Sequence, residues 1–183
     1  MRYTSAAIEP QPWKPQSFMP VSADVYSDIQ QFLIYEALVL DHGWFYLWAG
    51  MLSRDLTYKV SNCSGRAGTG LNAAQSIVYG SRESLLGPLE CSQPSGALVQ
   101  SHLPKTRRFV TNISVSFAPC RKDYAVVSYL RVVRTGQGGT DNAVWSAERR
   151  DLLRATDRSF AIAQRELLID SIEPGTAEHA HFL

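Results

Sequence analysis

The stretch IAQRELLID, residues 162–170, places a cation where a β-strand should be apolar. Side chains alternate between the two faces of a strand, so Arg165 shares a face with Leu167 and Ile169. An unpaired charge on a buried face is too costly to retain, so Arg165 predicts a carboxylate partner nearby. The preceding stretch ERRDLLR, residues 148–154, mixes acids, bases and leucines in the same way. Together the two segments predict a sheet whose concave side holds ion pairs.

Length and charge restrict the class of protein. A chain of 183 residues favours one domain with one well-buried core. The net charge of +1 argues against a nucleic-acid-binding protein, which would carry a basic excess on one face. No apolar run is long enough to span a membrane, and the N-terminus lacks the apolar centre of a signal peptide. We therefore expect a cytoplasmic protein without nucleic-acid or membrane partners.

The cysteines and histidines do not form a familiar metal motif. Cys63, Cys91 and Cys120 are odd in number and far apart, which predicts reduced thiols rather than disulfides or a zinc site. His179 and His181 beside Glu178 could be imagined as an iron-binding triad. A chain terminus lacks the surrounding groups that orient metal ligands, so we expect these side chains to be solvated or at an interface.

The first part of the chain predicts an arm followed by two helices. Four prolines forbid a regular helix before residue 21, and Trp13 and Phe18 could anchor an extended arm against a neighbouring surface. We assign residues 1–21 to this arm and residues 22–183 to a single domain. Apolar residues then recur at helical spacing over 25–40, after the N-cap Ser22, and over 44–52.

The rest of the chain is dominated by strands. Alternating apolar residues predict strands over 56–60, 109–117, 124–134, 144–154 and 160–172, with residues 109, 111, 113, 115 and 117 on one face. A short helix is predicted from Ser81 to Leu86, ending at Gly87-Pro88. The path of residues 61–103 is otherwise open. Helices followed by a run of antiparallel strands are typical of an α+β fold.

Four stretches in this order resemble one family. They are residues 32–60 (FLIYEALVLDHGWFYLW to DLTYKV), 104–115 (PKTRRFVTNISV), 148–170, and the terminal Phe182-Leu183. Over residues 25–183 the chain resembles the small (β) subunit of Rieske non-haem iron aromatic-ring-hydroxylating dioxygenases. The resemblance implies a nuclear-transport-factor-2-like fold, a cone in which N-terminal helices pack into a strongly curved, mostly antiparallel sheet.

The resemblance also implies a role in aromatic-compound catabolism. The chain would be a non-catalytic β subunit that holds no cofactor, forms a β trimer and supports catalytic α subunits in an α3β3 hetero-hexamer. The α subunits would hold a Rieske [2Fe-2S] cluster and a mononuclear Fe(II), and would receive electrons from a reductase and ferredoxin. By the same resemblance, we expect Phe182-Leu183 to be docked rather than frayed.

A set of charged residues is the candidate site. An arginine fork binds carboxylates bidentately even away from water, so we expect part of this set to form a buried ion-pair network that holds the helices and serves subunit contacts. The candidates are Glu36, Arg107, Arg108, Arg150, Asp151, Arg165 and Asp170.

Two other functions stay open at this point. Cone-shaped proteins of this kind include dehydratases and isomerases with an Asp/His pair, for which the candidates are Asp41, His42, Asp55 and Tyr58. A simple scaffold domain is the third possibility. An enzyme needs an open apolar pocket with a convergent acid and base, whereas a subunit needs a filled cone and exposed apolar patches.

Overall fold

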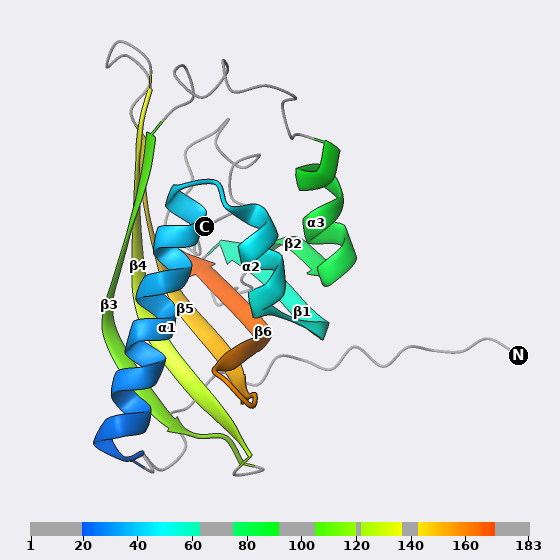
Figure 1. Ribbon diagram of the computed structural model, residues 1–183. Coiled ribbons are helices and arrows are strands. Elements are labelled where there is room, and N and C mark those ends of the chain that lie inside the picture. Colours follow the sequence, from blue (N-terminus) through cyan, green and yellow to red (C-terminus); the bar gives the residue numbers. More distant parts are fainter. Residues whose placement is uncertain (1–19, 63–74, 92–104, 120–121, 137–142, 171–183) are drawn as a thin grey trace, which may run out of the picture.

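The computed structural model describes residues 20–62, 75–91, 105–119, 122–136 and 143–170. The predicted arm lies outside this range except for Pro20, which forms an isolated antiparallel bridge to Ser116. The C-terminal Phe182-Leu183 and the histidines beside it also lie outside it. Three helices and one six-stranded sheet make up the described part (Figure 1).

The first helix, α1 (Ala23–Asp41), forms where the apolar spacing predicts it. The side chain of Ser22 accepts a hydrogen bond from the Val25 backbone N–H at 3.4 Å, which caps the helix N-terminus. At the other end His42 closes the helix, and Gly43 adopts a φ of +68°, a conformation that glycine enters without steric cost. The apolar face of α1 is buried, which confirms the predicted amphipathic helix.

The second helix, α2 (Phe45–Met51), is shorter and less buried than the sequence predicts. Trp48 and Met51 are in the core, but Trp44 and Leu47 remain 46% and 44% exposed. Three of the five apolar residues of the predicted stripe, Trp48, Met51 and Leu52, therefore face inward. Strand β1 (Leu52–Asn62) follows directly, so the predicted strand over 56–60 is the middle of a longer one.

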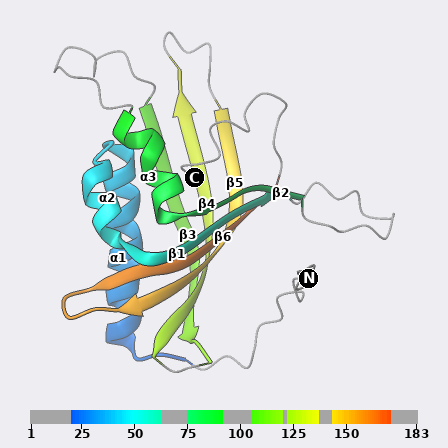
Figure 2. The same cartoon turned by 90° about the vertical axis from the view of Figure 1, so that its right-hand side faces the viewer.

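The sheet has the order β2-β1-β6-β5-β4-β3, and every neighbouring pair is antiparallel except β1 with β6. The remaining strands are β2 (Gln75–Ser81), β3 (Lys105–Phe117), β4 (Asp123–Thr135), β5 (Ala143–Ala155) and β6 (Phe160–Ile169). Strand β2 was not predicted, because the path of residues 61–103 was left open. The sheet curves around the helices, with α1 lying along β3 (Figure 2).

The third helix, α3 (Arg82–Cys91), continues through Gly87 and the proline after it, contrary to the predicted stop. Proline removes one main-chain hydrogen bond, but packing of neighbouring turns decides whether a helix persists. Here Leu85 is buried and Leu86 packs against the core, which holds the helix in place.

A β-bulge in β3 changes which side chains face inward. The pairing of β3 with β4 shifts register between Thr111 and Ser114, and Asn112 has a positive φ of 52°. An extra residue in one strand moves the following side chains to the opposite face. Phe109 is therefore 53% exposed while Val115 is 3% exposed, so the prediction of one common face over 109–117 is wrong.

Candidate functional site

Four charged side chains meet in the core, on the concave face of the sheet. They are Glu36 of α1, Arg149 and Asp151 of β5, and Arg165 of β6, each no more than 5% exposed. Arg149 and Asp151 are two residues apart on one strand, so both point inward. Asp151 lies directly opposite Arg165 in the β5–β6 pairing. We call these four residues the buried quartet.

Arg165 is the centre of the quartet. Its Nη1 and Nη2 donate to Glu36 Oε1 and Oε2 at 2.5 and 2.9 Å. Its Nε and Nη2 donate to Asp151 Oδ1 and Oδ2 at 2.7 and 3.0 Å. One guanidinium therefore binds two carboxylates bidentately, the geometry in which arginine pairs most strongly.

Arg149 is held less completely. Its Nη1 donates to Glu36 Oε2 at 3.2 Å and its Nε to Ser128 Oγ at 3.1 Å, with Asp151 Oδ2 at 3.3 Å from Nε. Its Nη2 has no hydrogen-bond partner among the described residues. On the other side of the quartet, the indole N–H of Trp48 donates to Glu36 Oε1 at 3.0 Å and ties α2 to the same carboxylate.

The quartet contains two acidic and two basic side chains, and its central pair, Glu36 and Arg165, stays ionised. Burial alone would raise the pKa of Glu36, but the charges of Arg165 and Arg149 and the hydrogen bonds from Arg165 and Trp48 lower it to about 2. Burial also acts against the charge of Arg165, yet Asp151 and Glu36 raise its pKa well above the usual value. For Arg149, burial outweighs the neighbouring carboxylates and lowers the pKa. Neither Glu36 nor Arg165 can exchange a proton near neutral pH, as a general acid or base must.

The structure brings three of the predicted candidates together and separates the other four. Glu36, Asp151 and Arg165 form the quartet with Arg149. The four candidates outside the quartet are Arg107, Arg108, Arg150 and Asp170. Arg108 donates from Nη1 to Asp41 Oδ1 at 2.8 Å, joining the end of α1 to β3. Arg107 is exposed and donates to the carbonyl of Thr106 at 2.9 Å.

The last two candidates lie outside the core. Arg150 pairs with Glu148 at 2.7 Å and Glu166 at 3.6 Å, all partly exposed. Asp170 is exposed and accepts a hydrogen bond from Ser146 Oγ at 2.5 Å. Arg150 was predicted for the buried network, but its neighbour Arg149 is the residue that joins the quartet. Strand alternation around Asp151 was the signal that identifies Arg149.

The residues considered for an Asp/His enzyme do not converge. Asp41 is engaged by the side chain and backbone N–H of Arg108. The Nδ1 of His42 lies 2.8 Å from the carbonyl of Leu38, and its ring stacks on Trp44 with centroids 4.6 Å apart. Through these contacts His42 caps the C-terminus of α1.

The other two residues of that hypothesis lie apart from this pair. Asp55 is on the surface, where hydrogen bonds from Arg154 and Ser53 lower its pKa to about 2. Tyr58 is 1% exposed in the core, and burial raises its pKa far above the usual value. Both groups are therefore poor proton-transfer partners near neutral pH.

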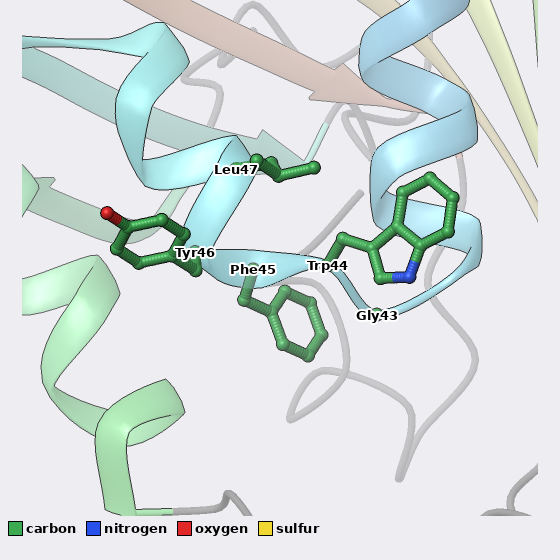
Figure 3. Close-up of a pocket in the computed structure, with 5 residues that line it drawn as sticks. All are labelled: Gly43, Trp44, Phe45, Tyr46 and Leu47. Carbon is green, nitrogen blue, oxygen red and sulfur yellow. The ribbon is translucent and has the colours of Figure 1, made fainter.

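Two surface hollows lie among the described residues, and no member of the quartet lines either of them. One, of about 360 Å³, is lined by residues 43–47 at the start of α2, where Trp44 lies toward α1 and Tyr46 points away from it (Figure 3). The other, of about 570 Å³, lies between α1 and the β5–β6 turn and is lined by Phe32, Tyr124 and Phe160 among others. Neither hollow is lined by any of the four residues of the Asp/His hypothesis, Asp41, His42, Asp55 and Tyr58.

Metal donors do not gather in the described part of the chain. No three His, Cys, Asp or Glu side chains there come together as a metal site requires. None of the helices seen in the structure is long and apolar enough to cross a membrane.

Comparison with known proteins assigns the chain to a family. The sequence model of the family "Ring hydroxylating beta subunit" matches residues 35–172. The chlorobenzene dioxygenase subunit beta of Cupriavidus sp. (strain PS12) is 26% identical over 162 residues, covering 82% of this chain and 84% of that one. The benzene 1,2-dioxygenase subunit beta of Pseudomonas putida is 25% identical over 162 residues, which again cover 82% of this chain and 84% of that one.

The fold agrees with this assignment. The solved structure of a naphthalene 1,2-dioxygenase with indole bound in its active site superposes with a TM-score of 0.76 at 19% identity. The match covers 91% of this chain and 90% of that one, and it confirms the cone-like α+β fold. From the family match over most of its length, the chain belongs to the ring-hydroxylating dioxygenase β subunits.

Proposed function

We propose that the chain supports catalysis without performing it, as the structural β subunit of a terminal oxygenase that adds both atoms of dioxygen to an aromatic ring. The observation that carries this proposal is the buried quartet. The inside of the cone is filled by paired acidic and basic side chains and by apolar residues. A reacting substrate needs an open pocket and a group that can gain or lose a proton there.

The metal centres belong to the partner in this proposal. A Rieske cluster needs two Cys and two His, and a mononuclear iron site needs two His and one carboxylate. The described residues bring no such donor set together, and the three cysteines are widely separated in the sequence. The catalytic α subunit would hold both centres and receive electrons through a ferredoxin or reductase.

Assembly follows from the same role. We propose that the chain forms a β trimer and joins three α subunits in a cytoplasmic α3β3 complex. Large apolar side chains that remain exposed on the helices and on the outer sheet support this, because such surfaces on a single chain mark interaction sites. The chlorobenzene and benzene dioxygenases among the relatives suggest an aromatic hydrocarbon as the substrate of the complex.

Co-expression with a Rieske α subunit from the same organism tests the proposal. A tag on the β chain should recover a complex with a Rieske electron paramagnetic resonance signal and activity that forms a cis-dihydrodiol. The β chain purified alone should show neither. Stoichiometric iron retained by the β chain alone after mild chelation, or dehydratase activity without α, would overturn the proposal.

A further inference from the structure

Strand β3 ends the six-stranded sheet, so one side of its backbone has no neighbouring strand in that sheet. The strand is 13 residues long. A long edge strand presents a row of N–H and C=O groups to which a strand from another chain can add, and natural proteins block such edges. The contacts along the β3 edge therefore decide what kind of partner can bind there.

Helix α1 lies along this edge, and both of its ends hold backbone groups of β3 (Figure 1, Figure 2). Near the start of the helix, the hydroxyl of Tyr26 donates to the Ile113 carbonyl at 3.2 Å. At the end of the helix, Asp41 Oδ2 accepts a hydrogen bond from the Arg108 backbone N–H at 3.1 Å. Two polar side chains of α1 therefore stand in for the hydrogen-bond partners that a further strand would supply.

The edge is engaged at two further points. Thr106 lies two residues before Arg108, so its backbone groups point to the same side of the strand. The Thr106 carbonyl accepts a hydrogen bond from the Arg107 side chain at 2.9 Å. Near the other end of β3, Ser116 forms an isolated antiparallel bridge with Pro20. A proline has no N–H to offer to a further strand, so this bridge does not create a new pairing edge at that residue.

These contacts differ from ordinary packing of a helix on a sheet, which apolar side chains can provide alone. Here α1 also places polar side chains at backbone groups of β3, and a β-bulge between Thr111 and Ser114 lies on the same strand. A bulge disturbs the regular spacing that a partner strand needs, and proteins use bulges to block edges. The side-chain contacts and the bulge together are the means by which an edge strand is closed to strand addition.

We propose that Tyr26 and Asp41 form an edge guard: they occupy outward-facing backbone groups of β3 and keep a strand of another chain from adding to the sheet. Other proteins then meet this side of the molecule through side-chain contacts and not through a shared sheet. The inference goes beyond the proposed function and does not depend on it, because a single chain needs this protection before it meets any partner.

Amide hydrogen exchange of the full chain tests the guard directly. Asp41→Ala removes the acceptor of the Arg108 N–H, so this amide should exchange about tenfold faster or more, while amides of the interior strand β4 keep their rates. Arg108→Met is the matched control. It removes the side-chain ion pair of 2.8 Å but retains the backbone N–H and its acceptor, so the amide at position 108 should stay protected.

Assembly is the second measurement. Tyr26→Phe combined with Asp41→Ala should form aggregates that bind thioflavin T about tenfold faster or more than wild type, because strand addition builds intermolecular sheets. Ile162→Val, in the core part of β6, controls for lost stability. The chains are compared at urea concentrations that unfold the same small fraction of each. Tyr26→Phe alone removes one oxygen atom and gives the same test where Asp41→Ala fails to fold.

Faster exchange at position 108 together with faster assembly supports the guard. An amide that stays protected in Asp41→Ala, or that loses protection equally in Arg108→Met, overturns it. Assembly no faster than that of Ile162→Val at the same unfolded fraction overturns it too, since aggregation would then follow unfolding alone.

Discussion

Arg165 and Glu36 lie 129 residues apart in the sequence and are joined inside the core by two N–H···O bonds of 2.5 and 2.9 Å. The pair connects α1 to β6, and Trp48 and Asp151 bring α2 and β5 to the same point. Apolar packing is non-directional, whereas a bidentate ion pair requires one geometry. We infer that the quartet specifies how the helices sit in the curved sheet.

Replacing Arg165 with Ala should destabilise the fold strongly. The change leaves Glu36 and Asp151 without their main partner in the core, and breaking a buried pair costs about 3–5 kcal/mol. Lys122→Ala, at an exposed position, should stay within about 0.5 kcal/mol. Lys59, partly exposed beside Glu166, should lie between them. Urea unfolding measures all three, and equal midpoints would contradict the role of the quartet.

Arg149 should matter less than Arg165, although both are buried. Methionine at either position removes one positive charge and keeps most of the volume. Arg165 makes four hydrogen bonds of 2.5–3.0 Å, whereas Arg149 leaves Nη2 unpaired. We expect Arg149→Met to cost less than Arg165→Met by about 1 kcal/mol or more. Urea unfolding of the two variants gives the comparison. A larger loss of unfolding free energy for Arg149→Met than for Arg165→Met would contradict the ranking by hydrogen bonds.

Acid should remove the contribution of Glu36. Its pKa falls from 4.5 to about 2 on folding, so its stabilisation is complete above about pH 4.5 and is lost as the pH falls towards 2. A shift of this size corresponds to about 3 kcal/mol. The difference in unfolding free energy between wild type and Glu36→Gln should therefore shrink between pH 6 and pH 3. The pKa of Asp55 is also lowered, but Asp55 is present in both proteins, so its contribution cancels in the difference. A difference that is constant with pH would refute the lowered pKa.

The bulge at Asn112 should tolerate glycine and reject valine. A positive φ is open to Gly and acceptable for Asn, but it costs an ordinary L-residue about 1–2 kcal/mol. Asn112→Val should lower the unfolding free energy by about that amount, and Asn112→Gly should leave it nearly unchanged. Thermal unfolding of the two variants provides the test. Equal loss in both would mean that the side chain of Asn112, rather than its backbone, matters here.

Deleting Phe182 and Leu183 should weaken assembly. These residues lie outside the described part of the chain, so docking of the terminus stays a prediction. Burying one such side chain contributes about 1.5–3 kcal/mol, enough to hold a short segment in place. Size-exclusion chromatography and thermal unfolding of the truncated chain would show the effect. An unchanged oligomer with unchanged stability would mean that the terminus plays no part.

Local periodicity was sufficient for most of the fold. The helical spacing around Leu33 and the alternation around Leu167 gave α1 and β6 because both elements bury one face. Arg165 could be singled out because it interrupts an apolar face. These signals need only neighbouring residues, so the sequence contains them in full.

The rest depends on contacts between distant segments. Exposure of Trp44 cannot be inferred from spacing, because spacing does not show whether a second surface covers it. The bulge at Asn112 moves the side chains that follow it to the opposite face of β3 from the one that strict alternation predicts. No glycine at this position indicates the bulge in the sequence. Whether Arg149 or Arg150 points into the core depends on which residues of β5 face inward. An error of one residue in that assignment exchanges the two faces of the strand.

Native mass spectrometry of the co-expressed β and Rieske α chains tests the central claim most directly. We predict one iron-containing assembly with equal numbers of the two chains, from which this 20.4 kDa chain dissociates free of iron. A chain that remains separate from α, or that carries the iron itself, would contradict its assignment as the structural subunit of the oxygenase.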